Sequence, residues 1–182
     1  MSFNQKIGQQ FLLFLVSPVI GIINAVKAKN HKVIVFSGTL FMGMVGSAFI
    51  YRSGSDGHTH MEDAKRFYTN MSFSQFVSDS FRLLTLQPVE YTTDLYKHIL
   101  SYLSAGLFGI PEMIHLFAGL LLGYYFTKSI LLTLEDKPKQ SNTILLLAFI
   151  ALFMTIRSVS ALNSIRMWTG MWVFFYGAFS FT

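Results

Sequence analysis

Long apolar runs separated by short basic turns constrain this chain more than any other feature. A helix needs about 20 apolar residues to cross the hydrocarbon core of a bilayer. The runs at 7–26, 33–51 and 112–134 approach or reach that length, and shorter runs follow at 143–157 and 167–182. With 52% hydrophobic and only 13% charged residues, a soluble protein of this size would leave much apolar surface in water. We therefore predict an all-α, polytopic transmembrane helical bundle of about five spans, forming a single membrane domain over 1–182.

The basic residues favour one orientation and argue against one class of partner. Lys27, Lys29 and Lys32 lie in the turn after the first run, and Lys137 and Lys139 lie in a later short turn. Lysines in short turns are typical of the cytoplasmic side. They do not gather on one helix face, so nucleic-acid binding is not predicted despite the net charge of +5. The absence of cysteine excludes thiol catalysis, disulfides and thiolate metal sites.

The segment 52–97 is too polar to cross a membrane and lies opposite the lysine-rich turns, so we predict an extracytoplasmic loop of short amphipathic helices. Thr59 with Glu62 fits the S/T-x-x-E capping box, which predicts a helix from about residue 60 to residue 71. An apolar, aromatic face at helical spacing predicts a second helix that lies in the membrane interface. The second helix is expected to begin near Ser72, and a third near Thr93.

Acidic residues and histidines crowd into the start of this loop, at Asp56, His58, His60, Glu62 and Asp63. One interpretation is a divalent metal site, because imidazole and carboxylate are suitable ligands, although the spacing D-x-H-x-H-x-x-D fits no defined motif. Another is a general base that takes a proton from a sugar hydroxyl. The helix dipole explains Glu62 and Asp63 in the first turn of the predicted helix. Asp56 precedes the predicted cap, so we prefer it as the base, with a plain turn aspartate as the alternative.

Two arginines near the end of the chain are candidates for binding phosphate. Arginine binds phosphate through several N–H donors in one plane. At a membrane boundary its long side chain also commonly extends so that the charge reaches water. Arg166 stands beside Asn163 at the start of an apolar run, which favours the phosphate role. Arg157 ends the preceding run, which favours the boundary role.

Three stretches together resemble a known family: GSDGHTHMEDAKRFY at 54–68, DLYKHILSYLSAGLFG at 94–109 and NSIRMWTGMWVFFYG at 163–177. They are similar to the EpsG-like family of bacterial polysaccharide polymerases, related to Wzy. The resemblance implies a multi-pass, GT-C-like glycosyltransferase of the bacterial cytoplasmic (inner) membrane, which joins oligosaccharide repeat units carried on undecaprenyl pyrophosphate for exopolysaccharide or O-antigen. It implies no nucleotide cofactor. Family members are longer, so we expect this chain to be the front part of a larger protein.

The resemblance also assigns roles to residues. Asp56 matches the acidic residue of the first outer loop, and Asn163 with Arg166 matches an N-x-x-R signature that would bind the donor pyrophosphate. His60 stands where the resemblance implies an aromatic residue. Further candidates are Glu62 and Asp63 as bases, and His58, His60, Arg66 and Arg157 as substrate-binding residues. The implied partners are the polyprenyl-pyrophosphate-linked oligosaccharide, the lipid bilayer and other membrane proteins of polysaccharide assembly.

Two other functions remain open from the residues alone. A transporter or flippase component for a lipid-linked sugar would carry charges inside its spans, whereas here the charges concentrate at the edges, with Lys128 the main exception. A non-catalytic membrane scaffold would use the aromatic faces to bind partners.

Overall fold

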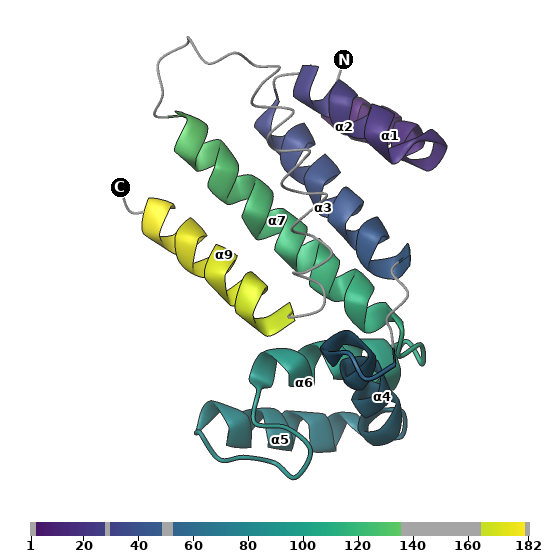
Figure 1. Ribbon diagram of the computed structural model, residues 1–182, viewed down its shortest axis with the longest axis vertical. Coiled ribbons are helices and arrows are strands. Elements are labelled where there is room, and N and C mark those ends of the chain that lie inside the picture. The colour runs from purple at the N-terminus through teal and green to yellow at the C-terminus, as the bar shows by residue number, and fades with distance from the viewer. Residues whose placement is uncertain (1–2, 28–29, 49–52, 136–164, 181–182) are drawn as a thin grey trace.

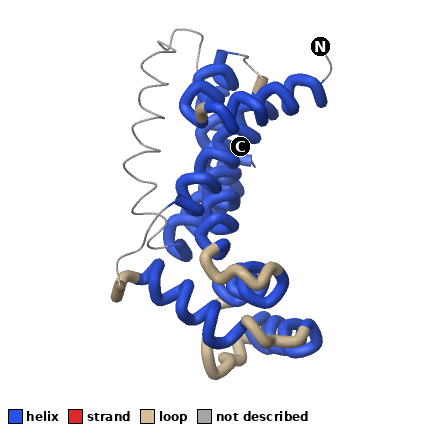
Figure 2. The backbone as a smooth tube through the Cα atoms, turned by 90° about the vertical axis from the view of Figure 1, so that its right-hand side faces the viewer, coloured by secondary structure: helices blue, strands red, loops and turns tan. Residues whose placement is uncertain are grey.

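The computed structural model describes residues 3–27, 30–48, 53–135 and 165–180. Throughout this part of the chain every regular element is a helix, joined by loops (Figure 2), so the all-α prediction is confirmed there. Three long helices form a bundle, and a group of short helices, the head, lies across one end of it (Figure 1). The bundle consists of α3 (His31–Ala48), α7 (Met113–Glu135) and α9 (Ile165–Ser180), and the head of α4 (Asp56–Tyr68), α5 (Phe73–Leu84), α6 (Leu95–Ser101) and the π-helix η1 (Tyr102–Leu107).

Glycines hold α3 and α7 together in antiparallel contact. A Cβ atom on Gly123 would lie 2.7 Å from the carbonyl oxygen of Gly38, and one on Gly119 would meet the backbone of Met42. Gly119 and Gly123 form a G-x-x-x-G pattern, which lets two helix backbones approach closely. This contact was not predicted from the sequence.

Aromatic side chains join α7 to α9. The rings of Phe126 and Trp172 meet edge to face, with centroids 4.7 Å apart. The Lys128 ammonium lies 5.6 Å from the ring centroid of Tyr124 and 5.4 Å from that of Tyr176. A lysine inside an apolar helix is therefore compensated by two aromatic faces.

The first predicted span, 7–26, is wrong as a single helix. The structure has α1 (Phe3–Val16) and α2 (Pro18–Lys27), which fold back on each other as a hairpin. The residue before a proline disfavours helical geometry, so the chain turns at Ser17. Across the hairpin Gln10 donates from Nε2 to the Gly21 carbonyl oxygen and accepts from Asn24 Nδ2 at 3.0 Å. At 1.5 Å per residue, α1 and α2 reach only about 21 Å and 15 Å, short of a bilayer core of about 30 Å.

One predicted span passes a test of length and composition. Within α7, Met113–Leu132 is long and apolar enough to cross a membrane, and it is the one such stretch among the described helices. This agrees with the prediction for 112–134. The window that α3 offers includes His31 and Lys32, and α9 has 16 residues. The predicted run 143–157 lies outside the described residues, so a bundle of about five spans is not confirmed.

A shared core attaches the head to the bundle. Side chains of α4, α6, η1 and α7 pack together there with Met71, which lies between α4 and α5. The buried members are Ala64, Tyr68, Met71, Leu100, Tyr102, Ala105, Ile114 and Ala118. The short helices fall where the sequence predicts them after residue 72, because Ser72 caps α5 and Asp94 caps α6. The helix from α6 continues as η1, in which the N–H of Phe108 donates to the Leu103 carbonyl at 3.2 Å. Gly109, at φ +69°, ends it.

Candidate functional site

Helix α4 begins earlier than the sequence predicts. Ser55 is the N-cap, and its hydroxyl accepts a hydrogen bond from the backbone N–H of His58 at 3.4 Å. Thr59 lies inside the first turn, and its hydroxyl donates to the Ser55 carbonyl oxygen at 3.1 Å. The predicted capping box of Thr59 and Glu62 is therefore wrong. Ser55 is an equally good cap, and Gly54, at φ +83°, forms the turn that leads into it.

This earlier start changes the interpretation of Asp56. Asp56 is the first residue of α4 and is exposed. The helix dipole favours a carboxylate at that position. The sequence analysis used this dipole to explain Glu62 and Asp63 without a catalytic role, and the same explanation applies to Asp56. Its carboxylate is nevertheless open to solvent, at the mouth of the helix, where a substrate hydroxyl could reach it.

The candidate residues on α4 are divided between two faces. His60 is 8% exposed and packs inward with Gly57, Ala64 and Tyr68, whereas Asp56, Glu62 and Arg66 are exposed and His58 is half-buried. His60 lies near the imidazole of His115, which also contacts the Gly57 backbone, where α4 meets α7. His60 therefore occupies a core position of α4. The Arg66 guanidinium lies 5.1 Å from the ring centroid of Phe67.

Asp63 has a clear structural partner. Its Oδ2 forms an ion pair with Lys97 Nζ at 2.5 Å, and the two side chains are only 28% and 14% exposed. Because Lys97 belongs to α6, this pair ties α4 to the next helix of the head. A carboxylate held in an ion pair between two helices is less free to reach a substrate hydroxyl than an exposed one, so Asp63 is the least suitable of the three candidate bases.

The metal alternative depends on several ligands converging on one point. Among the described residues no group of three or more histidine, aspartate or glutamate side chains is arranged to hold a metal ion. Asp56 and His60, which the spacing D-x-H-x-H-x-x-D would pair, lie on the exposed and buried sides of α4.

The late candidates are placed only in part. Arg157 and Asn163 lie outside the described residues, and Arg166 falls in the first turn of α9. The start of α9 is at the head end of the bundle (Figure 1). There the hydroxyl of Tyr96 in α6 donates to Thr169 Oγ1 at 3.2 Å. The backbone that carries Arg166 and the head that carries Asp56 are therefore at the same end of the molecule.

A buried aromatic network inside the head was not foreseen from the sequence. The Tyr68 hydroxyl lies 3.0 Å from His98 Nδ1, and His98 Nε2 lies 3.3 Å from the Phe76 carbonyl oxygen. A carbonyl only accepts, so Nε2 carries the proton and Nδ1 accepts from Tyr68. Nearby, the Tyr91 hydroxyl donates to Asp79 Oδ2 at 2.5 Å. The neutral imidazole thus joins α4, α5 and α6.

Burial controls the ionisation of this network. It lowers the pKa of His98 from its ordinary value of 6.5, and it raises the pKa values of Tyr68 and Tyr91. At Tyr91 the hydrogen bond to Asp79 adds to the rise. Burial also raises the pKa of Tyr96 to about 12. These groups stay neutral at physiological pH, which indicates a structural core.

No family model matches this chain, and no match is found among curated proteins or solved structures.

Proposed function

We propose that this protein is a membrane glycosyltransferase of the polysaccharide-polymerase type. It joins polyprenyl-pyrophosphate-linked oligosaccharide repeat units at the outer face of the bacterial cytoplasmic membrane, and Asp56 is its general base. One observation carries the proposal: an exposed carboxylate opens α4 in a polar head, and the first turn of α9, which includes Arg166, begins beside that head.

The proposed reaction needs a base, a leaving group and a cation. Asp56 takes the proton from an acceptor sugar hydroxyl as its oxygen attacks the anomeric carbon of the donor. The bond from that carbon to the pyrophosphate oxygen breaks, and the electron pair leaves with the polyprenyl pyrophosphate. Arg166, and secondarily Asn163 and Arg157, would hold the pyrophosphate and stabilise its growing charge. The lipid pyrophosphate is the activating group, so the scheme uses no nucleotide.

Other residues of the head have secondary roles in this scheme. Glu62 is the alternative base, because its carboxylate is also exposed on α4, whereas Asp63 holds α4 to α6 through Lys97. His58 is partly exposed in the first turn of α4, and Arg66 is exposed in its last turn; in this scheme both contact sugar hydroxyls. His60 is buried, and it supports α4 from the inside.

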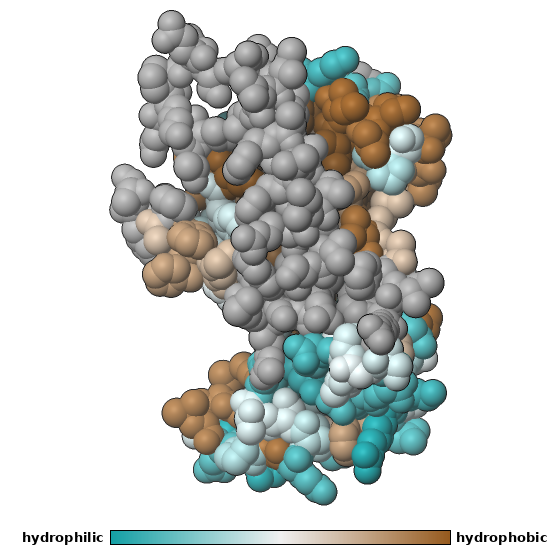
Figure 3. Space-filling view, in the orientation of Figure 1, coloured by the Kyte–Doolittle hydropathy of each residue, from teal (hydrophilic) through white to brown (hydrophobic). Residues whose placement is uncertain are grey.

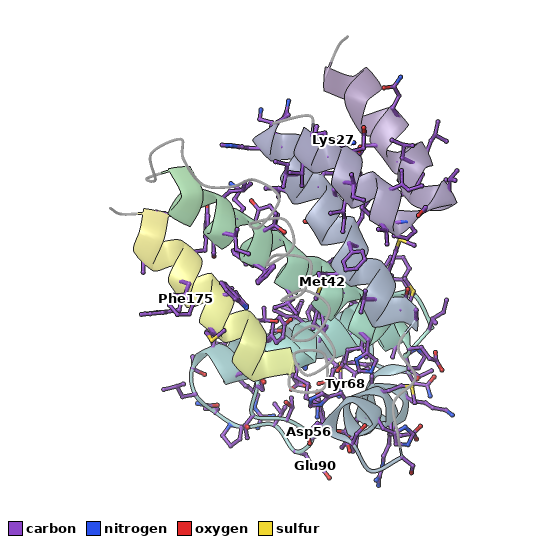
Figure 4. The ribbon with its side chains drawn as sticks, turned by 45° about the horizontal axis from the view of Figure 1, so that its top comes forward. Lys27, Met42, Asp56, Tyr68, Glu90 and Phe175 are labelled. Carbon is purple, nitrogen blue, oxygen red and sulfur yellow. The ribbon has the colours of Figure 1, made fainter. Side chains whose placement is uncertain are left out.

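The arrangement of the two ends of the bundle agrees with the proposed orientation. Lys27 ends α2 and His31 begins α3 at the end opposite the head, where α7 also ends at Glu135 (Figure 1). In Figure 4 the labelled Lys27 and Asp56 lie at opposite ends of the molecule, with Met42 between them. A cytoplasmic basic end would therefore expose the head to the outer face.

The experiment compares polymer length in cells that carry single variants of the full-length gene. Asp56→Asn removes the base but keeps the shape and should abolish long polymer, and Arg166→Ala should shorten it. Lys65→Gln is a matched control, because Lys65 is exposed on the same helix and has no role in the scheme. Protein levels are compared by immunoblot. Normal polymer from both Asp56→Asn and Arg166→Ala, at normal protein levels, would overturn the assignment.

A further inference from the structure

A pocket lies in the bundle far from the head, between α2, α3 and α7. The empty space in and directly in front of it is about 430 Å³, part of which is open solvent, and its accessible lining is apolar throughout. The lining comes from the last turns of α2, the first turns of α3 and the last turns of α7, including Ala25, Val26, Ile34, Gly38, Phe126 and Ile130.

Two hydroxyls near this pocket do not contribute to its accessible lining. Ser37 Oγ accepts a hydrogen bond from Gln10 Nε2 at 3.0 Å. Thr127 Oγ1 is buried against Gly38 and has no hydrogen-bond partner among the described residues. A ligand inside the pocket would therefore find carbon and almost no hydrogen-bonding group. Such a lining suits a hydrocarbon chain and disfavours a sugar or a nucleotide.

The surroundings of the pocket indicate where such a chain comes from. The outer face of the α1–α2 hairpin is strongly apolar and exposed; its members include Leu12, Leu15, Val16, Val19 and Ile20, which are between 52% and 82% exposed. Figure 3 shows this apolar surface over the hairpin and a mostly hydrophilic surface over the head. An exposed apolar surface of this kind favours contact with lipid over contact with water. In a membrane, lipid would therefore border the pocket wall formed by α2.

Charge at the same end identifies the chemistry of the headgroup. Lys27 is the last residue of α2, directly after the pocket residue Val26. Lys32 lies in the first turn of α3, just before the pocket residue Ile34. Both lysines are exposed. A lipid whose chain fills the pocket would thus have its headgroup beside two ammonium groups, which favours a phosphate with net negative charge.

We propose that this pocket binds one acyl chain of an anionic phospholipid of the inner leaflet, with Lys27 and Lys32 holding its phosphate. The donor lipid of the proposed polymerase is a less suitable occupant, because its pyrophosphate would be at the head, at the opposite end of the bundle. The site does not depend on Asp56, so it can be tested whether or not the protein is a polymerase.

The test titrates the purified full chain in neutral detergent with phosphatidylglycerol or with phosphatidylcholine of the same acyl chains, and counts bound lipid by native mass spectrometry. Phosphatidylglycerol should bind more tightly by about fivefold for each lysine, or about thirtyfold for both. Lys27→Gln with Lys32→Gln should reduce its affinity to that of phosphatidylcholine.

A second pair of variants tests the pocket itself. Val26→Trp should fill the pocket from its half-buried wall and lower the affinity for both lipids. Ile20→Trp adds the same ring on the exposed face of α2 and should leave binding unchanged. Circular dichroism checks that each variant is folded. Equal affinity for the two lipids, no lipid binding by the natural protein, or binding that Val26→Trp does not weaken would each overturn the proposal. Preferential binding of a polyprenyl phosphate, insensitive to the two lysines, would do so as well.

Discussion

The contact between α3 and α7 predicts that a single methyl group on Gly119 destabilises the bundle. A Cβ atom there would lie 2.9 Å from the carbonyl carbon of Met42 and 3.2 Å from Cα of Gly43. All of the atoms that it meets are backbone, so no side chain can rotate away, and the two helices must separate along their shared face. Overpacking of this kind costs about 1–3 kcal/mol.

The matched control is Gly170→Ala in α9, where an added Cβ would have nothing within 4 Å. Alanine is the better helix former, by about 1 kcal/mol in water, so this variant should be neutral or slightly stabilised. The free energy of unfolding is measured in mixed micelles by titration with sodium dodecyl sulfate, followed by circular dichroism. Gly119→Ala should lose about 1–3 kcal/mol. If Gly119→Ala and Gly170→Ala unfold alike, the close backbone contact of α3 and α7 is wrong.

Two further predictions concern the head. Burial lowers the pKa of His98 below its ordinary 6.5, so the unfolded chain binds a proton more readily than the folded chain. The contribution of the neutral imidazole to the free energy of unfolding should therefore be complete above about pH 6.5 and decline as the pH falls toward the lowered pKa. The free energy of unfolding is measured with urea on the micelle-embedded protein at pH 8 and pH 5. Between these pH values His98→Gln should lose less of it than the natural protein, and an equal loss would contradict the buried neutral imidazole. The pair Asp63–Lys97 is partly exposed, so its coupling free energy in a double-mutant cycle should be about 1–2 kcal/mol, between the ranges for exposed and buried pairs; a coupling near zero would show that the pair does not hold α4 to α6.

Much of the head could be predicted because its signals are local. Ser72 and Asp94 stand directly before apolar residues at helical spacing, and the structure uses both as N-caps. Gly109 likewise ends η1, and a glycine that follows a helix is a local stop signal. The start of α4 was misplaced because two good caps, Ser55 and Thr59, stand one helical turn apart, and hydrogen-bonding capacity alone does not rank them.

The errors arise where the deciding contacts are distant in sequence. The run 7–26 has the composition of one span, and only the pairing of Gln10 with Gly21 and Asn24 shows that it folds into a hairpin. Polar residues inside an apolar run, with Pro18 between them, were the available signal. The packing of Gly119 against Met42 likewise depends on an antiparallel register between α3 and α7.

The candidate site was predictable as a group of residues but not as a geometry. Asp56, His60 and Asp63 are close in sequence, yet α4 turns one outward, one inward and one toward Lys97. Once the first residue of α4 is known, helical periodicity places them on different faces of the helix. Because the N-cap was predicted at the wrong residue, the sequence did not show which of them faces solvent. The network of Tyr68 and His98 joins separate helices, and its only sequence signal was the density of aromatic residues around 96–102.

The proposed polymerase activity is tested most directly by reconstituting the natural protein in liposomes that contain polyprenyl-pyrophosphate-linked oligosaccharide repeat units. The products are separated by size, and the sidedness of the lipid-linked substrate is followed in parallel. We predict a ladder of products spaced by one repeat unit, formed by the natural protein and by Lys65→Gln and absent with Asp56→Asn. Substrate that stays at one repeat unit, whether it remains in place or crosses the bilayer, would contradict a polymerase, and its movement across the bilayer would instead identify a transporter.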